Sequence, residues 1–245
     1  RTFTNDASPE TVLWLDHGRD NYAGVTWSDL ERADGSKLFI GWMSNWKYAN
    51  VTPTVEWRSA MTLPRDLSLK TGPSGVRLVQ TPVAEVRQLR KQSQSWADVT
   101  VQPGENILAE AHGDLYEIEC EIEMGDAAEV GFKLRKSERE ETVVGYQAAE
   151  NLLFLDRIHS GESSFHELFA CQHGVQMEPT DGRIKLHMFV DQSSVEVFAN
   201  NGEIAITDQI FPSPSSTGME LYVTGGSAKV ITLHLHKLKS MWPVE

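Results

Sequence analysis

The sequence predicts an all-β protein in which a few propeller-type strands precede an antiparallel β-sandwich. Three observations indicate this class. The first 70 residues break into short apolar runs separated by turn residues, as at Ala33-Asp34-Gly35-Ser36. From about residue 97 onward, apolar and polar residues alternate with a period of two. No segment has the apolar spacing of a long helix.

The first part of the chain, residues 1–72, is expected to form four short strands. They are predicted at 11–15, 22–27, 37–42 and 57–63, the last ended by Pro64. Short strands joined by tight turns form a meander, which is the unit of a β-propeller blade. So few strands cannot close a propeller, and alone they would leave an edge and an apolar face uncovered.

Residues 73–96 are predicted to form a connector. Gly72-Pro73-Ser74-Gly75 has turn composition, and a short strand is expected at 76–80. The apolar residues of 83–91 have helical spacing.

Residues 97–245 are predicted to form the β-sandwich. In 116–124 every odd residue is acidic and every even one is apolar, which is typical of a strand with one buried face. Asn200-Asn201-Gly202 between apolar alternations predicts a hairpin, because its residues tolerate positive φ. With further runs near 131–135, 184–190, 221–223 and 230–238, we expect roughly nine to twelve strands.

Charge is uneven along the chain and excludes several classes of partner. The net charge is −13, with residues 1–96 slightly basic and residues 97–245 strongly acidic. An acidic sandwich without a basic stripe would repel phosphate backbones, so no nucleic acid partner is expected. No apolar run approaches the roughly 18 residues of a membrane span, so no membrane partner is expected either. A neutral substrate fits better.

Cysteine and histidine give no sign of a metal site. Cys120 lies within an alternating strand and is expected to point inward, while its pairing with Cys171 stays open. The eight histidines are scattered, and His234 and His236 are expected on the wet face of the last strand. No metal is predicted.

Aromatic residues gather in 41–67, where Trp42, Trp46 and Trp57 stand among Asn45 and other polar residues. Indole faces stack on the C–H faces of a sugar ring, and neighbouring amides bind its hydroxyls. The cluster therefore favours the wall of a carbohydrate pocket. The alternative is that these rings belong to the core.

Several motifs resemble glycoside hydrolase family 32, the β-fructosidases, which include invertases, levanases and exo-inulinases. The resemblance covers essentially the whole chain in the family's order. It rests on the segments 15–23, 41–50, 57–65, 75–82 and 190–198.

This resemblance implies a five-bladed β-propeller that holds the active site, joined by a short connector to a β-sandwich. It implies retaining hydrolysis of a terminal β-fructosyl bond of levan, inulin or sucrose, without a metal or an organic cofactor. An Asp nucleophile and a Glu acid/base would flank the anomeric carbon, about 5–5.5 Å apart as in retaining enzymes generally. Polymer-degrading members are often exported, although the sequence itself leaves localisation open.

The sequence departs from the family in one decisive way. The family's Asn-Asp-Pro-Asn, Arg-Asp-Pro and Glu-Cys motifs are absent, and Glu119-Cys120 lies in a sandwich strand. No residue of this chain is therefore predicted to be catalytic. The chain resembles the C-terminal part of such an enzyme, beginning inside the fourth blade and inactive alone. We expect a second chain that carries the N-terminal half of the propeller as its partner.

Six residues are predicted to bind substrate. Trp46 is the best candidate because family members use a tryptophan of this motif against the fructosyl unit, with Trp42 as the alternate. The remaining four are Asn45, beside Trp46, and Asp16, Arg19 and Asp20, which occupy a turn that the family pattern places at the pocket rim.

Structural alternatives exist for these residues and others. An Asp-x-Gly turn such as that of Asp16 is often structural. Arg58 and Arg65 are expected to tie the first domain to the connector by charge-assisted bonds. Asp191 and Glu196 are interpreted as hairpin-capping and wet-face residues of a sandwich strand.

Two other functions stay open at this point. The chain could be a non-catalytic carbohydrate-binding or interaction module, since β-sandwiches often serve so. It could also belong to a fructosyltransferase of the same family, because the covalent intermediate can pass to a sugar instead of water.

Overall fold

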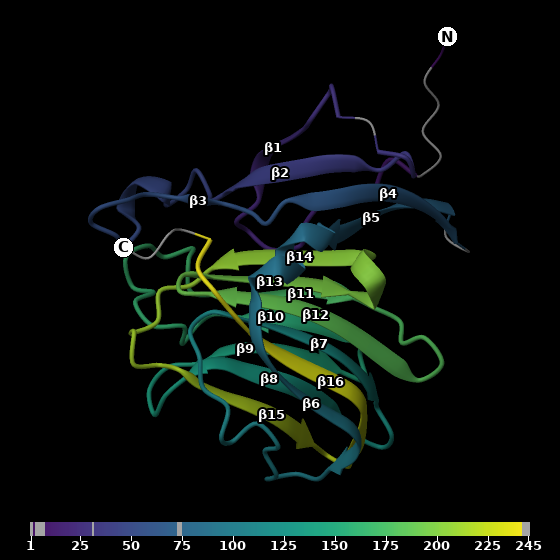
Figure 1. Ribbon diagram of the computed structural model, residues 1–245, viewed down its shortest axis with the longest axis vertical. Coiled ribbons are helices and arrows are strands. Elements are labelled where there is room, and N and C mark those ends of the chain that lie inside the picture. Colours follow the sequence, from purple (N-terminus) through teal and green to yellow (C-terminus); the bar gives the residue numbers. More distant parts are fainter. Residues whose placement is uncertain (1, 3–7, 31, 73–74, 242–245) are drawn as a thin grey trace.

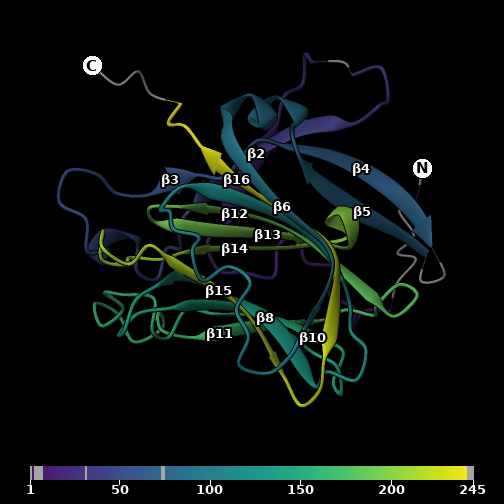
Figure 2. The same cartoon turned by 60° about the horizontal axis from the view of Figure 1, so that its bottom comes forward.

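The computed structural model describes residues 2, 8–30, 32–72 and 75–241. The predicted all-β class is confirmed: the described residues form three antiparallel sheets, and their helical segments are short 3-10 turns. Figure 1 shows a small sheet stacked above a two-sheet sandwich, and Figure 2 shows the same arrangement from below. None of the helical segments in the described residues is long and apolar enough to cross a membrane.

The first sheet has the strand order β1-β2-β4-β5, and the short β3 pairs with β2. Its strands are β1 (Tyr22–Thr26), β2 (Lys37–Met43), β3 (Ala60–Met61), β4 (Arg65–Gly72) and β5 (Gly75–Pro82). The predicted strands at 22–27 and 37–42 are confirmed. Only two residues of the predicted strand at 57–63 pair, as β3.

The predicted strand at 11–15 is wrong. The segment has no ladder partner among the described residues, and Val12, Leu13 and Trp14 are 59–68% exposed. An apolar run forms a strand only when another strand supplies its backbone hydrogen bonds, and the run alone does not reveal whether that partner exists.

The β4–β5 hairpin extends the first sheet into the segment predicted as a connector, since β4 and β5 pair along their whole lengths. Pro73 and Ser74 of the predicted turn lie outside the described residues. The expected helical spacing at 83–91 corresponds to a 3-10 helix, η2 (Ala84–Leu89). Val83 and Val86 pack there against Phe189 and Phe198 of the sandwich.

In the described residues the sandwich has eleven strands in two sheets, which agrees with the predicted nine to twelve. The six-stranded sheet contains β14 (Ile204–Gln209), β13 (Ser194–Ala199), β12 (Arg183–Asp191), β7 (Tyr116–Glu123), β16 (Ala228–Leu238) and β6 (Arg90–Val101), in that order. The five-stranded sheet contains β11 (Gln172–Gln176), β10 (Leu152–Asp156), β9 (Thr142–Gln147), β8 (Glu129–Lys136) and β15 (Gly218–Thr224).

The period-two pattern fixes which face of each sandwich strand is inside. In β7, Ile118 and Ile122 are fully buried and Cys120 is 6% exposed, all in the main core between the sheets. Each such aliphatic side chain contributes about 1.5–3 kcal/mol by its burial. Cys120 and Cys171 are both free thiols, so they do not pair.

The predicted Asn-Asn-Gly hairpin is confirmed, because β13 and β14 pair antiparallel around it. Asn200, Asn201 and Gly202 all have positive φ, with values of 47°, 60° and 88°. A Cβ on Gly202 would overlap the carbonyl of Gln80 in β5, so glycine is required both for its φ and for the close approach of the two chains.

One prediction about the sandwich surface is wrong. Glu196 of β13 was expected on a wet face, but it is only 3% exposed, whereas Asp191 is exposed at its turn as expected. The outer face of the sandwich is covered here, since the backbone N–H of Leu63 and the side chain of Arg65 both donate to Glu196. Beside β13, strand β14 lies below the first sheet (Figure 1).

Candidate functional site

Three aromatic rings form an exposed group on the first sheet, which we call the aromatic cluster (Tyr22, Trp42 and Trp46). Tyr22 of β1 stands opposite Trp42 of β2 in the strand register, with ring centroids 6.2 Å apart. Trp46 follows β2, with its ring centroid 5.1 Å from that of Trp42 and 6.3 Å from that of Tyr22. Trp46 is 69% exposed and Tyr22 is 53% exposed, so the cluster presents ring faces to solvent.

The alternative that these tryptophans are core residues therefore does not apply to Trp46. Trp57 is also exposed, at 45%, but no ring contact joins it to the cluster in the part of the chain that the structure describes. The structure thus brings Trp42 and Trp46 together as predicted and adds Tyr22.

Asn45 shapes the turn that presents Trp46. Its carbonyl accepts the N–H groups of Tyr48 and Ala49 at 3.1 and 2.8 Å. Its side-chain Oδ1 accepts the N–H of Lys47 at 3.0 Å, and its Nδ2 donates to the carbonyl of Arg19 at 3.0 Å. Such a local side-chain turn suits asparagine. Asn45 is half-buried, with its amide engaged by backbone groups.

Asp16 lies in a buried ion network between the first sheet and the sandwich. Its Oδ2 accepts from Nη1 of Arg65 at 3.0 Å and from Oγ1 of Thr207 at 2.6 Å. Its Oδ1 accepts from the N–H of Gly18 at 2.9 Å, the contact expected of a structural Asp-x-Gly turn. Burial alone would raise the pKa of Asp16, but Arg65 and the hydrogen bonds hold that pKa below its usual value.

Arg65 is the centre of this network. It is fully buried and also donates through Nη2 to Oε2 of Glu196 at 2.7 Å. Nη1 of Arg65 also donates to Oε1 of Gln80 at 2.9 Å, which is the expected charge-assisted bond to the connector segment, and the bond to Glu196 adds a tie to the sandwich. Within the described residues, the hydrogen bonds of Arg58 go only to Thr54 and to the carbonyl of Trp57, so its expected tie to the connector is wrong. Burial raises the pKa of Glu196 despite Arg65.

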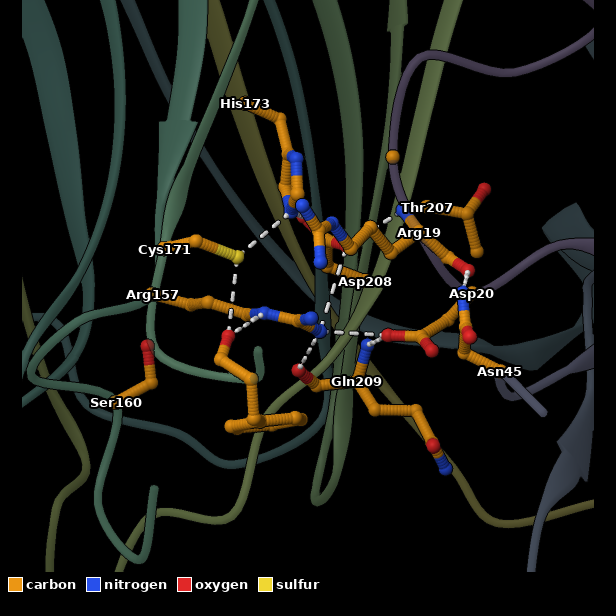
Figure 3. A network of polar contacts seen from close by, with 12 residues as sticks. Arg19, Asp20, Asn45, Arg157, Ser160, Cys171, His173, Thr207, Asp208 and Gln209 are labelled. Carbon is orange, nitrogen blue, oxygen red and sulfur yellow. Dashed lines mark hydrogen bonds and ion pairs between the residues drawn. The ribbon is translucent and has the colours of Figure 1, made fainter. Parts of the chain in front are cut away.

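Asp20 lies in a second buried network, shown in Figure 3. Its Oδ2 accepts from Nη1 of Arg157 at 2.6 Å and from the N–H of Gln209 at 2.8 Å, and its Oδ1 accepts from the hydroxyl of Tyr48 at 2.7 Å. Asp20 and Arg157 are both 0% exposed. Asp208 completes the network, 3.4 Å from Nη1 of Arg157.

In this second network, as in the first, two buried carboxylates share one guanidinium. Burial raises the pKa of Asp208 to about 7, although Arg157 opposes the shift. His173 Nε2 lies 3.4 Å from Oδ2 of Asp208. Burial, helped by Arg157, lowers the pKa of His173 to about 4, so this imidazole is neutral near neutral pH.

Arg19 bridges the two parts of the chain at the surface. It is exposed, and its Nη1 donates to the carbonyl of Leu168 in the loop between β10 and β11 at 3.1 Å. Its backbone N–H donates to Oδ1 of Asp208 at 3.0 Å, and its carbonyl holds Asn45. Arg19 therefore lies where the sandwich meets the turn that carries Trp46.

The six predicted substrate residues thus separate into two groups. Trp42 and Trp46 form the exposed aromatic cluster, with Asn45 and Arg19 at its base. Asp16 and Asp20 point away from solvent, into ion networks with arginines. Both carboxylates are buried and bonded to side chains and backbone groups of the protein.

Sequence reasoning did not identify Tyr22, Arg157, Thr207 and Asp208. Tyr22 could have been found, because it begins a strand directly after the motif that holds Asp16, Arg19 and Asp20. Arg157 gives no such signal, since its partner Asp20 is 137 positions away.

A group of potential metal ligands also arises from the fold. Oxygen or nitrogen atoms of Glu117, Glu119 and His187 lie within 4.8 Å of one another on the outer face of the six-stranded sheet. Arg90 already donates to Glu117 at 2.5 and 2.6 Å and to Glu119 at 2.7 Å, while His187 Nε2 lies 2.7 Å from Glu117. Burial alone would raise the pKa of Glu117. Its bonds to His187 and Arg90 outweigh burial and lower that pKa to about 2.

This group is therefore an ion-pair network whose oxygens are already engaged by a guanidinium. A cavity of about 500 Å³ lies beside it, between η2 and the sandwich, and none of its lining residues belongs to the aromatic cluster. Of the two histidines expected on a wet face, His234 is exposed but His236 is buried at 8% exposure, and both bond to serines of β6.

Comparison with known proteins identifies the family of the chain. Residues 1–82 match the model of the glycosyl hydrolases family 32 N-terminal domain, and residues 85–237 match that of the family 32 C terminal. The chain is 48% identical to a levanase of Bacillus subtilis, over 98% of this chain and 36% of that protein. It is 36% identical to an extracellular exo-inulinase of Aspergillus awamori, over 98% of this chain and 46% of that protein.

Solved structures show the same fold. The crystal structure of the exo-inulinase from Aspergillus awamori superimposes with a TM-score of 0.88 at 35% identity, over 98% of this chain and 48% of that one. A fructofuranosidase from Schwanniomyces occidentalis in complex with fructose gives a TM-score of 0.78 at 20% identity, over 92% of this chain and 49% of that one. The chain thus spans between about a third and a half of the length of these relatives.

Proposed function

Because the chain belongs to glycoside hydrolase family 32, we propose that it forms the C-terminal part of a retaining exo-β-fructosidase. The whole enzyme would hydrolyse terminal β-D-fructosyl bonds of fructans such as levan or inulin, or of sucrose. The relatives named levanase and exo-inulinase support this substrate class.

The observation that carries the proposal is the exposed aromatic cluster. Trp46 is 69% exposed although a side chain of its size contributes strongly to stability when buried. Its turn is fixed by four hydrogen bonds of Asn45, and its ring packs against those of Trp42 and Tyr22, so the exposed ring is held in place. An immobilised indole face is suited to stack on a fructosyl ring, and we assign this role to Trp46, with Trp42 as its neighbour.

We place the catalytic carboxylates outside this chain. A retaining mechanism needs two carboxyl groups that reach the same anomeric carbon. The acidic residues of the motif nearest the cluster, Asp16 and Asp20, are buried and paired with Arg65 and Arg157. This pairing supports a positioning role for them, and we propose that the chain alone has no hydrolytic activity.

We further propose that the first sheet packs against other propeller strands. Five large apolar side chains that precede, lie in or follow β1 in sequence are 44–68% exposed: Val12, Leu13, Trp14, Val25 and Trp27. Among the described residues, β1 is an edge strand of the first sheet. An exposed apolar group beside an unpaired strand edge marks an interaction surface. Strands of the N-terminal part of a family 32 propeller are the proposed occupant, on the same or on a second chain.

The proposal is tested by reconstitution. The chain is mixed with a polypeptide of a family 32 enzyme that supplies the Asn-Asp-Pro-Asn, Arg-Asp-Pro and Glu-Cys motifs, and fructose release from levan, inulin and sucrose is measured. We expect hydrolysis by the mixture and none by either chain alone, with a large loss in Trp46→Ala. Hydrolysis by this chain alone would refute the placement of the carboxylates.

A second candidate function is a non-catalytic carbohydrate-binding module. The closed core between the two sandwich sheets favours it, because their inner apolar faces are buried against each other. Binding of levan or inulin by the chain, with no hydrolysis in any mixture, would support the module. Transfer of fructosyl units would instead appear as oligosaccharide products when sucrose is the sole substrate.

A further inference from the structure

We propose that Arg157, a residue of the sandwich, is a positioning residue for the sugar-stacking ring of Trp46. The inference rests on the proposed function of the aromatic cluster. It gives the sandwich a defined role in substrate binding, although no sandwich side chain is part of the cluster.

Arg157 itself is held in a fixed position within the sandwich. It follows β10, is 0% exposed, and uses all three of its guanidinium nitrogens as donors. Nε donates to the carbonyl of Phe169 at 2.8 Å, and Nη1 donates to the carbonyl of Gln209 at 3.1 Å. The guanidinium carbon also lies 4.0 Å from the centre of the Phe169 ring. These contacts anchor the guanidinium within the sandwich.

The Arg157 guanidinium also bonds to the first part of the chain. Nη1 of Arg157 donates to Oδ2 of Asp20 at 2.6 Å, and Nη2 donates to the hydroxyl of Tyr48 at 2.9 Å. The hydroxyl of Tyr48 in turn donates to Oδ1 of Asp20 at 2.7 Å. The three side chains therefore form a closed, buried ring of hydrogen bonds, which fixes Tyr48 relative to the sandwich.

The same hydrogen-bond network extends to the turn of Trp46. Figure 3 shows its members Arg157, Asp20, Arg19 and Asn45. Tyr48 donates its backbone N–H to the carbonyl of Asn45 at 3.1 Å. Asn45 donates from Nδ2 to the carbonyl of Arg19, the residue before Asp20. Two chains of contacts therefore hold the turn of Trp46, one through Tyr48 and one through Arg19 and Asp20. Both lead to Arg157.

Lysine cannot reproduce this arrangement. A single ammonium would keep the charge beside Asp20 and Asp208, but it cannot bond Phe169, Asp20 and Tyr48 together in the planar geometry of a guanidinium. Arg157→Lys should therefore keep the buried charge balance while releasing Tyr48 and the turn that follows β2.

The experiment uses the full chain labelled with 5-fluorotryptophan, and Trp46→Phe assigns the ¹⁹F resonance of Trp46. In Arg157→Lys we expect this resonance to move and broaden, and the affinity for 1-kestose, followed by titration, to fall about three- to tenfold. Arg135→Lys is the matched control. Arg135 is another buried sandwich arginine, but its side-chain nitrogens donate to carbonyls within the sandwich, such as that of Ser216. It should leave the Trp46 resonance and the affinity unchanged.

Two results would overturn the inference: an unchanged Trp46 resonance in folded Arg157→Lys, or an equal change in Arg135→Lys. If Arg157→Lys does not fold, Tyr48→Phe tests the inference instead, because it removes only the Tyr48 hydroxyl from the buried hydrogen-bond network. A displaced Trp46 resonance in Tyr48→Phe supports the inference, and an unchanged one overturns it. Unchanged 1-kestose affinity in Trp46→Ala would instead refute the proposed function, whatever the resonance shows.

Discussion

Removal of the Arg65 side chain should destabilise the chain strongly, because it leaves two buried carboxylates without their cation. The side chains of Asp16 and Glu196 are each 4% exposed, and that of Arg65 is 0% exposed. Breaking a buried ion pair by removing one partner costs about 3–5 kcal/mol, since the remaining charge is buried and uncompensated. We expect Arg65→Met to lower the free energy of unfolding by this amount.

The loss should also depend on pH in a definite direction. Without Arg65, burial would raise the pKa of both carboxyls above their unfolded values. A carboxyl with a raised folded pKa destabilises the fold above that pKa, and the penalty disappears as pH falls and the group takes up a proton. The destabilisation by Arg65→Met should therefore be larger at about pH 8 than at about pH 5.

Urea unfolding followed by tryptophan fluorescence measures this effect, since most of the tryptophans lie in the first part of the chain. Arg58→Met is the matched control: Arg58 is exposed and bonds only locally, so a change within about 0.5 kcal/mol is expected. A loss below about 1 kcal/mol for Arg65→Met, or one that grows as pH falls, would refute the reasoning.

Three further predictions concern other parts of the molecule. The folded pKa of Asp208 is raised to about 7 from 3.8, so stability should rise as pH falls through that window, and Asp208→Asn should flatten this slope in thermal melts at several pH values. Ellman's reagent should react with the half-buried thiol of Cys171 in the folded chain. It should not react with Cys120, because burial raises the pKa of that thiol to about 12. Two fast-reacting thiols would contradict this prediction. Gly202→Ala should destabilise by more than Gly182→Ala in urea unfolding, because both glycines have positive φ but only at Gly202 would the new Cβ overlap a carbonyl of β5.

Much of the fold could be predicted because local patterns carry it. The alternation at 116–124 identified β7 and its inner face, and the Asn-Asn-Gly turn identified the β13–β14 hairpin. Alternation says which side chains share a face, but not what covers that face. Glu196 shows this limit: it lies on the outer face as the pattern requires, and is buried because Leu63 and Arg65 cover it.

The candidate site was predictable only in its exposed part. Trp42, Asn45 and Trp46 are close in sequence, so their composition alone suggested a sugar-binding surface. Asp16 and Asp20 pair with residues far along the chain, and such pairs leave no local period to detect. Their burial comes from the contact between the first part of the chain and the sandwich, which is a property of the tertiary structure.

The two buried arginines also constrain how such proteins can be recombined. Arg65 reaches from the first sheet into the sandwich, and Arg157 reaches from the sandwich into the loop that precedes the first sheet. An engineer who exchanges sandwiches between relatives would separate each guanidinium from an acid on the other side of the junction. Functional chimeras should therefore require that both sets of charges be transplanted together.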